Sequence, residues 1–241
     1  MAVEEIAPAL TGRALSAQRW ASLTFLHWPV DPDAVRHLFP AGVEPDTIDG
    51  RTYVGLVPFK MRGAGPGGRL PVPYFGDFCE TNVRLYSVDG QGRSGIVFRT
   101  LEAQRLSTVL LARYALGLPY TWSQMQAIHA GDLWRYTSRR RWPGGGKGGL
   151  RSRITVRIGD VATPTPLEIW LTARWGLHTS IAGRTVWVPN QHDTWPLHEA
   201  QIVDLDDDLV AGVGVPTAGD MLRPLFSPGV KTVFGLPSLV R

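Results

Sequence analysis

The chain has 241 residues, a formal charge of +4 and 44% hydrophobic residues. This composition is typical of a globular protein with one large domain, and so small a positive charge does not by itself indicate a nucleic-acid-binding protein. The single cysteine, Cys79, excludes an intramolecular disulfide, and no run of about 18 apolar residues predicts a membrane span. Because the first residues lack the basic and apolar regions of a signal peptide, we expect a cytoplasmic protein.

The first part of the chain predicts a strand and then a short helix. Residues 1–17 are expected to form a loosely held leader, and residues 18–241 a single domain. Residues 18–28, QRWASLTFLHW, carry apolar side chains in both alternation phases, which predicts a strand covered on both faces. Asp31 then fits a helix N-cap and Pro32 the first helical position.

Turn signals divide the next stretch into strands. Asp-Gly at residues 49–50 predicts a hairpin turn, and the Gly- and Pro-rich residues 61–73 predict a loop. The clearest strand pair flanks residues 89–92, Asp-Gly-Gln-Gly.

Two segments predict longer helices. Residues 105–117, RLSTVLLARYALG, offer Ser107 as an N-cap and Gly117 as a C-terminal stop. Residues 165–175, TPLEIWLTARW, begin with Thr165 as the cap and a proline in the first turn.

The remaining segments predict strands. Residues 133–142 and 150–159 flank a Gly-rich stretch, which predicts a hairpin with a mobile basic tip. Later strands are expected at 184–190, 199–209 and 230–237. Strands therefore dominate, and we expect a mainly β (α+β) fold in which an antiparallel sheet with two or three inserted helices curls into a barrel or cone.

One predicted strand alternates polar and apolar residues in a way that suggests a site. In residues 78–86, Glu80, Asn82 and Arg84 point to one face. This face is either a solvated outer surface with an ion pair, or a polar wall inside a barrel. In the second case Glu80 could move a proton and Arg84 could hold a carboxylate.

Two further segments leave alternatives open. Residues 190–200 contain His192, Asp193 and His198, but the histidine spacing matches no standard zinc site, so we expect no metal; the segment is either a loop at a cavity mouth or a plain surface loop. Residues 139–149, RRRWPGGGKGG, are either a solvated hairpin tip or a surface that contacts phosphates.

Taken together and in this order, several motifs resemble the DUF2071 (YqjF-like) family, from about Arg19 to the C-terminus. They are LTFLHWPVDPDAV, DGRTYVGLVPFKMRG, ETNVRLY, LGLPYTWSQM, LTARWGLHT, HDTWPLHEA and LFSPGV. The family implies no established activity. Its common Thr-Glu-Arg-Tyr motif is Thr-Ala-Arg-Trp in residues 172–175 of this chain, so any role of that glutamate is absent.

This family is distantly similar to the acetoacetate decarboxylase superfamily. That resemblance implies an antiparallel β-cone or barrel around an apolar cavity, and a pair of lysines after a Gly-x-Pro turn, one of which forms a Schiff base. Here Tyr120 and Thr121 follow the turn, and neither side chain forms an imine. Lys60 is the best substitute elsewhere in the chain. Glu80 is implied in the place of a glutamate that lines the cavity.

The sequence thus predicts a protein that binds a small organic acid or carbonyl compound in an internal cavity, with no Schiff-base lysine and no cofactor or metal. We expect catalytic roles for Glu80 and Tyr120. The residues expected to contact the ligand are Asn82, Arg84, Arg113, Thr121 and His192.

Whether the protein is an enzyme is left open. A Tyr/Glu pair could support cofactor-independent lyase or isomerase chemistry. The alternatives are a non-catalytic binding or sensing module and, less favoured, a surface for phosphate or nucleic acid. A homodimer through an exposed edge strand is a further expectation, and no membrane partner is expected.

Overall fold

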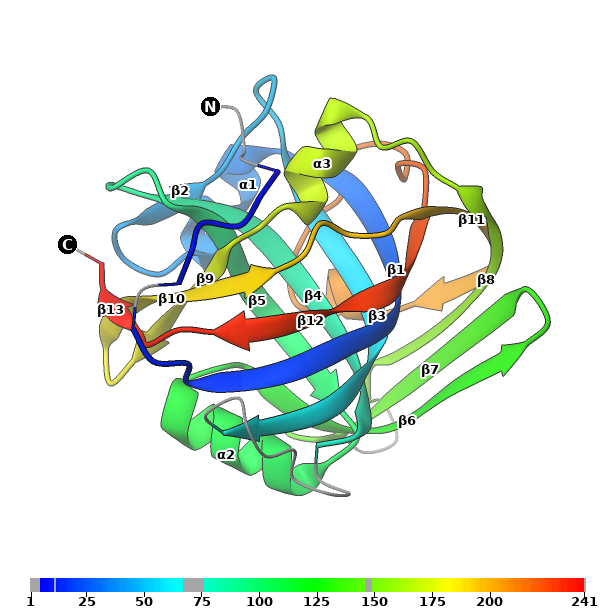
Figure 1. Ribbon diagram of the computed structural model, residues 1–241, viewed down its shortest axis with the longest axis horizontal. Coiled ribbons are helices and arrows are strands. Elements are labelled where there is room, and N and C mark those ends of the chain that lie inside the picture. The colour runs from blue at the N-terminus through cyan, green and yellow to red at the C-terminus, as the bar shows by residue number, and fades with distance from the viewer. Residues whose placement is uncertain (1–4, 11, 67–75, 146–148, 241) are drawn as a thin grey trace.

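The computed structural model describes residues 5–10, 12–66, 76–145 and 149–240. Strands form most of this part of the chain, and the sheet curves around a central space (Figure 1). The strands are β1 (Ser16–Val30), β2 (Val43–Pro45), β3 (Thr52–Pro66), β4 (Phe78–Asp89), β5 (Ser94–Ala103), β6 (Tyr120–Ala130), β7 (Leu133–Trp142), β8 (Arg151–Val161), β9 (Gly176–Ile181), β10 (Arg184–His192), β11 (His198–Asp207), β12 (Leu225–Phe234) and β13 (Ser238–Leu239).

The strands belong to one sheet, in the order β13-β10-β9-β5-β6-β7-β8-β11-β12-β1-β3-β4-β2. Two additional pairings, β10 with β12 and β4 with β5, close this sheet on itself. Most neighbouring pairs are antiparallel; β5 pairs in parallel with β6 and β9. The predicted mainly β class is therefore confirmed.

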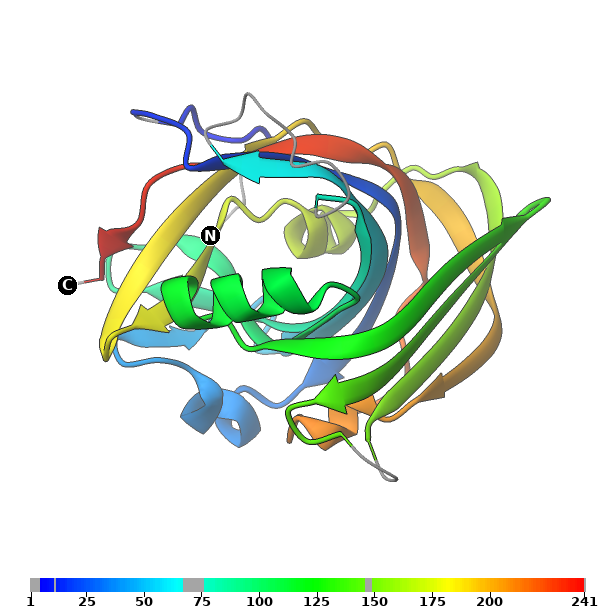
Figure 2. The ribbon, with the colours of Figure 1, turned by 90° about the horizontal axis from the view of Figure 1, so that it is seen from below.

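Four α-helices interrupt the strands in the described residues: α1 (Pro32–Val35), α2 (Leu106–Leu116), α3 (Pro166–Thr172) and α4 (Leu209–Gly212), with a 3-10 turn, η1, at Arg36–Leu38. α2 and α3 lie at opposite ends of the curved sheet (Figure 1). Seen from below, α2 crosses the near opening of the ring of strands (Figure 2).

Local sequence signals explain where two helices begin. The Asp31 side chain accepts a hydrogen bond from the Asp33 backbone at the start of α1, and Thr165 and Glu168 form a complete capping box on α3. The prediction of Ser107 as the cap of α2 is wrong: the N-cap is Arg105, which makes no side-chain capping bond, and Ser107 lies inside the helix.

The strands confirm most of the predicted turns, with two corrections. Asp49 and Gly50 both have positive φ, as a two-residue turn requires, but only the single bridge between Ile48 and Arg51 flanks it. Residues 61–66, predicted as part of a loop, instead continue β3, because they pair with the start of β1. The rest of that predicted loop, and the tip of the 133–159 hairpin at residues 146–148, lie outside the described residues.

Apolar side chains fill both sides of the central strands. One cluster, which includes Phe25, Val57 and Leu101, surrounds the site described below, and a second, which includes Leu56 and Val83, packs on the opposite face.

The first strand, β1, begins at Ser16, inside the segment predicted as a leader. Burial on both faces explains why β1 carries apolar side chains in both alternation phases.

Candidate functional site

A cavity of about 230 Å³ lies within the curved sheet and beneath α2. Its walls come mainly from the apolar side chains of β1, β3, β5, β9 and α2. This volume is below the ~300 Å³ at which sites for drug-sized ligands begin, so the cavity suits a small molecule. Its wall contains three ionisable side chains, Glu80, Arg84 and Tyr120.

Strand β4 supplies most of the polar wall. Glu80, Asn82 and Arg84 all line the cavity, and their exposed fractions are 2%, 5% and 8%. Because alternate residues of a strand face the same side, one extended segment aligns all three side chains. The structure thus agrees with the second interpretation of this face, a polar wall inside the sheet, and not with a solvated outer surface.

Tyr120 reaches this wall because of the turn after α2. Gly117 ends the helix with φ of 62°, and a Cβ at this position would lie 2.1 Å from the Ser180 carbonyl oxygen, so only glycine fits. β6 then starts at Tyr120, which pairs with Leu101 of β5, and Leu101 in turn pairs with Asn82 of β4. Tyr120 and Asn82 therefore flank Leu101 on neighbouring strands.

Glu80 and Tyr120 are hydrogen-bonded in the cavity wall. The Tyr120 hydroxyl donates to a Glu80 carboxyl oxygen at 2.9 Å. Burial raises the pKa of Glu80 to about 8, although hydrogen bonds from Tyr120 and Asn82 oppose the shift. Burial, and then the neighbouring Glu80, raise the pKa of Tyr120 well above its usual value. At neutral pH both groups therefore mainly carry their protons.

Arg84 brings a positive charge into this apolar space. Its Nη2 donates to the Leu171 carbonyl at 3.2 Å and to the Tyr86 hydroxyl at 3.4 Å. Among the described residues, no carboxylate forms an ion pair with Arg84; its Nε and Asn82 Oδ1 are buried without a hydrogen-bond partner. A buried charge without a counter-charge is costly, so this guanidinium is poised to accept an anion.

A buried network behind Arg84 holds it in place. The Tyr86 hydroxyl donates to the Leu171 carbonyl at 2.9 Å and lies 2.7 Å from His27 Nε2. Burial, and then the charge of Arg84, lower the pKa of His27 well below its usual value, so the imidazole is neutral. Gly55 leaves room for both side chains: a Cβ there would lie 3.2 Å from His27 Cδ2 and 3.3 Å from Arg84 Cγ.

Three of the residues expected to contact a ligand lie outside the cavity wall. Arg113 donates to the Tyr120 carbonyl at 2.9 Å and lies over the Trp142 ring, while Thr121 is buried without lining the cavity. His192 packs between the rings of Trp175 and Trp195, and burial lowers its pKa to about 4. None of the three is brought to Glu80 and Arg84.

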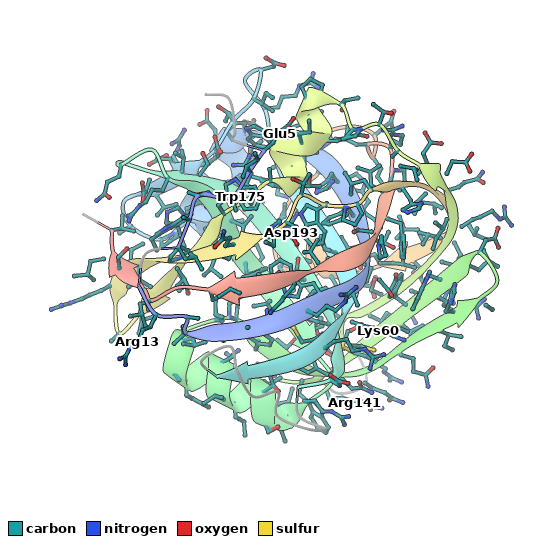
Figure 3. The ribbon with its side chains drawn as sticks, viewed as in Figure 1. Glu5, Arg13, Lys60, Arg141, Trp175 and Asp193 are labelled. Carbon is teal, nitrogen blue, oxygen red and sulfur yellow. The ribbon has the colours of Figure 1, made fainter. Side chains whose placement is uncertain are left out.

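Lysine side chains are not part of the described cavity wall. Phe59 and Met61 line the cavity, so Lys60 between them on β3 (Figure 3) points to the other face of that strand. There its Nζ lies 4.9 Å from the centre of the Trp134 ring. Lys231 is exposed on β12, and Lys147 lies outside the described residues.

Several residues of the candidate site and its surroundings were not predicted from the sequence. Tyr86 continues the alternation of Glu80, Asn82 and Arg84, and that phase was the available signal for it. Trp20 and the α2 residues Thr108 and Leu111 line the cavity without any such signal, because their position depends on how distant segments pack.

The described residues hold no group of three His, Cys, Asp or Glu side chains arranged to bind a metal ion. In the same part of the chain, no helix has the length and apolar character needed to cross a membrane.

Comparisons with known proteins give a family and a fold. The DUF2071 family, described as an uncharacterized conserved protein, matches residues 17–231. The uncharacterized protein YqjF of Bacillus subtilis (strain 168) is 30% identical over 189 residues, which cover 76% of this chain and 75% of that protein.

Solved structures share the fold at low sequence identity. Acetoacetate decarboxylase from Legionella pneumophila has a TM-score of 0.67 at 11% identity, covering 98% of this chain and 92% of that one. The enduracididine biosynthesis enzyme MppR complexed with pyruvate has a TM-score of 0.63 at 12% identity, covering 97% and 93%. An acetoacetate decarboxylase-like enzyme from Sphingomonas wittichii RW1 has a TM-score of 0.63 at 13% identity, covering 97% and 95%.

Proposed function

Because the chain belongs to the DUF2071 family and has an acetoacetate decarboxylase-like fold, we propose that its cavity binds a small organic acid that also carries a carbonyl group. In the same proposal, Glu80 takes a proton from this ligand and returns one to it, without a Schiff-base lysine. In this proposal Arg84 pairs with the carboxylate of the ligand. Asn82 and Tyr120 contact its carbonyl end.

The observation that carries the proposal is Arg84. A guanidinium that is 8% exposed, without an acidic partner in the described part of the chain, lies in the wall of an otherwise mainly apolar cavity. An arginine and a carboxylate form two parallel hydrogen bonds, and such a ligand would offset the cost of burying the charge.

Proton transfer follows from the environment of Glu80. A general acid or base works best with a pKa near the working pH, and burial raises the pKa of Glu80 to about 8. The ionised tenth or so of Glu80 present at pH 7 takes a proton from the carbon next to the carbonyl group, and the electron pair moves to the carbonyl oxygen. The same carboxyl group then returns a proton to the enolate, at the same or a neighbouring atom, which completes an exchange or isomerase-type step.

Two observations favour a 2-oxo acid as the first probe. One structural neighbour is complexed with pyruvate. In addition, a 2-oxo acid presents a carboxylate, which Arg84 could bind, and a carbonyl oxygen, to which Asn82 or Tyr120 could donate a hydrogen bond.

The test is exchange of the methyl protons of pyruvate for deuterium, followed by NMR in D₂O. We expect exchange with the wild-type protein, at least a ~100-fold lower rate for Glu80→Gln, and a smaller loss for Tyr120→Phe. Glu199→Gln, on the exposed side of β11, is the matched control and keeps the wild-type rate. Pyruvate binding without exchange would favour the sensing module, and no binding of any organic acid would contradict the proposal.

The absence of imine chemistry has its own test. Treatment with borohydride in the presence of pyruvate is expected to leave the protein unmodified. A covalent adduct on Lys60, found by mass spectrometry, would instead restore a Schiff-base mechanism.

A further inference from the structure

We propose that the acid bound by Arg84 carries an unbranched apolar tail, which runs through the cavity to an opening beneath α2 and contacts Leu111 there. This inference rests on the proposed function, because the position of the head group fixes where the tail begins. It goes further by naming the shape of the ligand and the element that measures its length.

The ionisable side chains occupy only one part of the cavity. Glu80, Asn82, Arg84 and Tyr120 gather on β4 and the start of β6, whereas apolar side chains form most of the remaining wall. These include Leu23, Val57, Phe98, Leu101, Leu118 and Ile181. A ligand that was polar throughout would lose its hydrogen bonds to water against this wall without replacing them, so the wall selects a molecule with one polar end.

Helix α2 provides the other end of the cavity. The cavity is lined, on the side where α2 crosses the opening of the sheet, by residues Thr108, Leu111, Ala112 and Leu116 of this helix. Ala112 is buried, but Leu111 is 69% exposed although it also lines the cavity. Among the described residues, the cavity therefore meets solvent along the edge of this helix.

The opposite rim comes from distant parts of the chain. Leu15 and Gln18 at the start of β1, and Pro237 after β12, also line the cavity. In Figure 2 these segments lie around the near opening of the sheet, which α2 crosses. The cavity thus extends from the charged residues of β4 to a mainly apolar rim.

An open rim and a closed cavity predict different responses to ligand length. A closed cavity rejects any tail that is too long. In a cavity that opens at an apolar rim, each added methylene increases affinity until the tail reaches solvent, after which affinity levels off.

The experiment is calorimetric titration with straight-chain monocarboxylates from propionate to dodecanoate, below their micelle concentrations. For the wild-type protein we expect Kd to fall about four-fold for each methylene buried, the equivalent of ~0.8 kcal/mol, and then to reach a plateau. Leu111→Gln is expected to weaken the acids whose tails reach the rim by about ten-fold more than it weakens propionate.

Leu110→Gln is the matched control, because Leu110 is the neighbouring leucine on the same helix, is 40% exposed, and does not line the cavity. It should retain the wild-type dependence on chain length. An equal response of the two variants, a Kd independent of chain length, or a sharp loss of binding beyond a certain length would overturn the inference.

The outcomes also separate this inference from the proposed function. If propionate binds in an Arg84-dependent way while longer tails add nothing, the head-group site stands and the tail path is wrong. If none of the acids binds, the proposed function fails and the inference falls with it.

Discussion

Two buried polar clusters lie at opposite ends of strand β4, and they differ in how their charges are paired. At the far end, Asp89 accepts hydrogen bonds from Arg93 Nε at 2.6 Å and from the backbone of Gln91 at 2.9 Å. His178 lies 3.2 Å from Asp89 and 2.9 Å from the Ser87 hydroxyl. Burial alone would raise the pKa of Asp89, but these hydrogen bonds lower it, so the carboxylate stays ionised.

At the near end, the cavity cluster of Glu80, Asn82, Arg84 and Tyr120 is only partly satisfied. Burial raises the pKa of Glu80, whereas hydrogen bonds lower the pKa of Asp89. Arg84 has no acidic partner in the part of the chain that the structure describes.

The Asp89 cluster is suited to stabilising the fold, whereas the cavity cluster is suited to binding a ligand. Ser87, His178 and Asp89 have the hydrogen-bonding order of a catalytic triad, yet Ser87 and His178 are almost fully buried and none of the three lines the cavity. A nucleophile needs access to its substrate, so distances alone do not make this cluster a site. The cavity cluster combines access with unpaired polar atoms.

The largest expected effect is on stability at the far end of β4. Asp89→Ala removes the partner of the buried His178 and of the partly buried Arg93, and should lower the free energy of unfolding by about 3 to 5 kcal/mol. Urea denaturation followed by tryptophan fluorescence measures it. A loss below about 1 kcal/mol would contradict a stabilising role for this cluster.

The second effect is the pH dependence that Glu80 gives to stability. The pKa of Glu80 is about 8 in the folded protein and near its usual value of 4.5 in the unfolded chain, so the folded state holds one more proton between these values. Stability should therefore fall as pH rises from about 5 to 8, by up to ~1.4 kcal/mol per pH unit, and Glu80→Gln should remove this slope. Parallel slopes for the two proteins, in urea titrations at several pH values, would show that Glu80 is not buried as a neutral acid.

A smaller effect is expected from crowding the network behind Arg84. Gly55→Ala places a methyl group against His27 and Arg84 and should cost about 1 kcal/mol of stability and shift the guanidinium, with weaker binding of pyruvate. Gly90→Ala is the control, because a Cβ at Gly90 meets nothing within 4 Å. Equal pyruvate affinity in both variants would show that the position of Arg84 does not matter.

The smallest effect on stability is expected at the cavity itself. Arg84→Met keeps an apolar stem and removes an unpaired charge, so the free energy of unfolding should change by less than about 1 kcal/mol or increase. A loss comparable to that of Asp89→Ala would mean that Arg84 is paired after all and serves the fold.

Strand β4 also illustrates how far the sequence could predict this site. The alternation of its residues predicted that Glu80, Asn82 and Arg84 share one face, and the turn at residues 89–92 predicted the pair of strands on either side of it, β4 and β5. The sequence did not show which face was internal, because β4 is buried on both sides and has no exposed face for comparison.

Residues placed by tertiary packing were harder to predict. His192 was expected near the ligand from its polar neighbours in sequence, but it packs against Trp175 and against Trp195 of its own segment. Conversely, Leu111 was not predicted to lie near the ligand, but it lines the cavity because of how α2 packs against the sheet. Turns and caps are local features, whereas the position of Leu111 in the cavity wall depends on contacts between residues far apart in the chain.

The most direct test of the central claim is calorimetric titration of pyruvate from pH 6 to pH 9.5 with the wild-type protein, Glu80→Gln and Arg84→Met. We expect wild-type affinity to fall several-fold between about pH 8 and pH 9.5, because ionised Glu80 weakens the binding of the anion without abolishing it. The account also predicts that Glu80→Gln binds with no such fall and that Arg84→Met binds at least ~10-fold more weakly throughout. Equal affinity of Arg84→Met and the wild-type protein at every pH would contradict it.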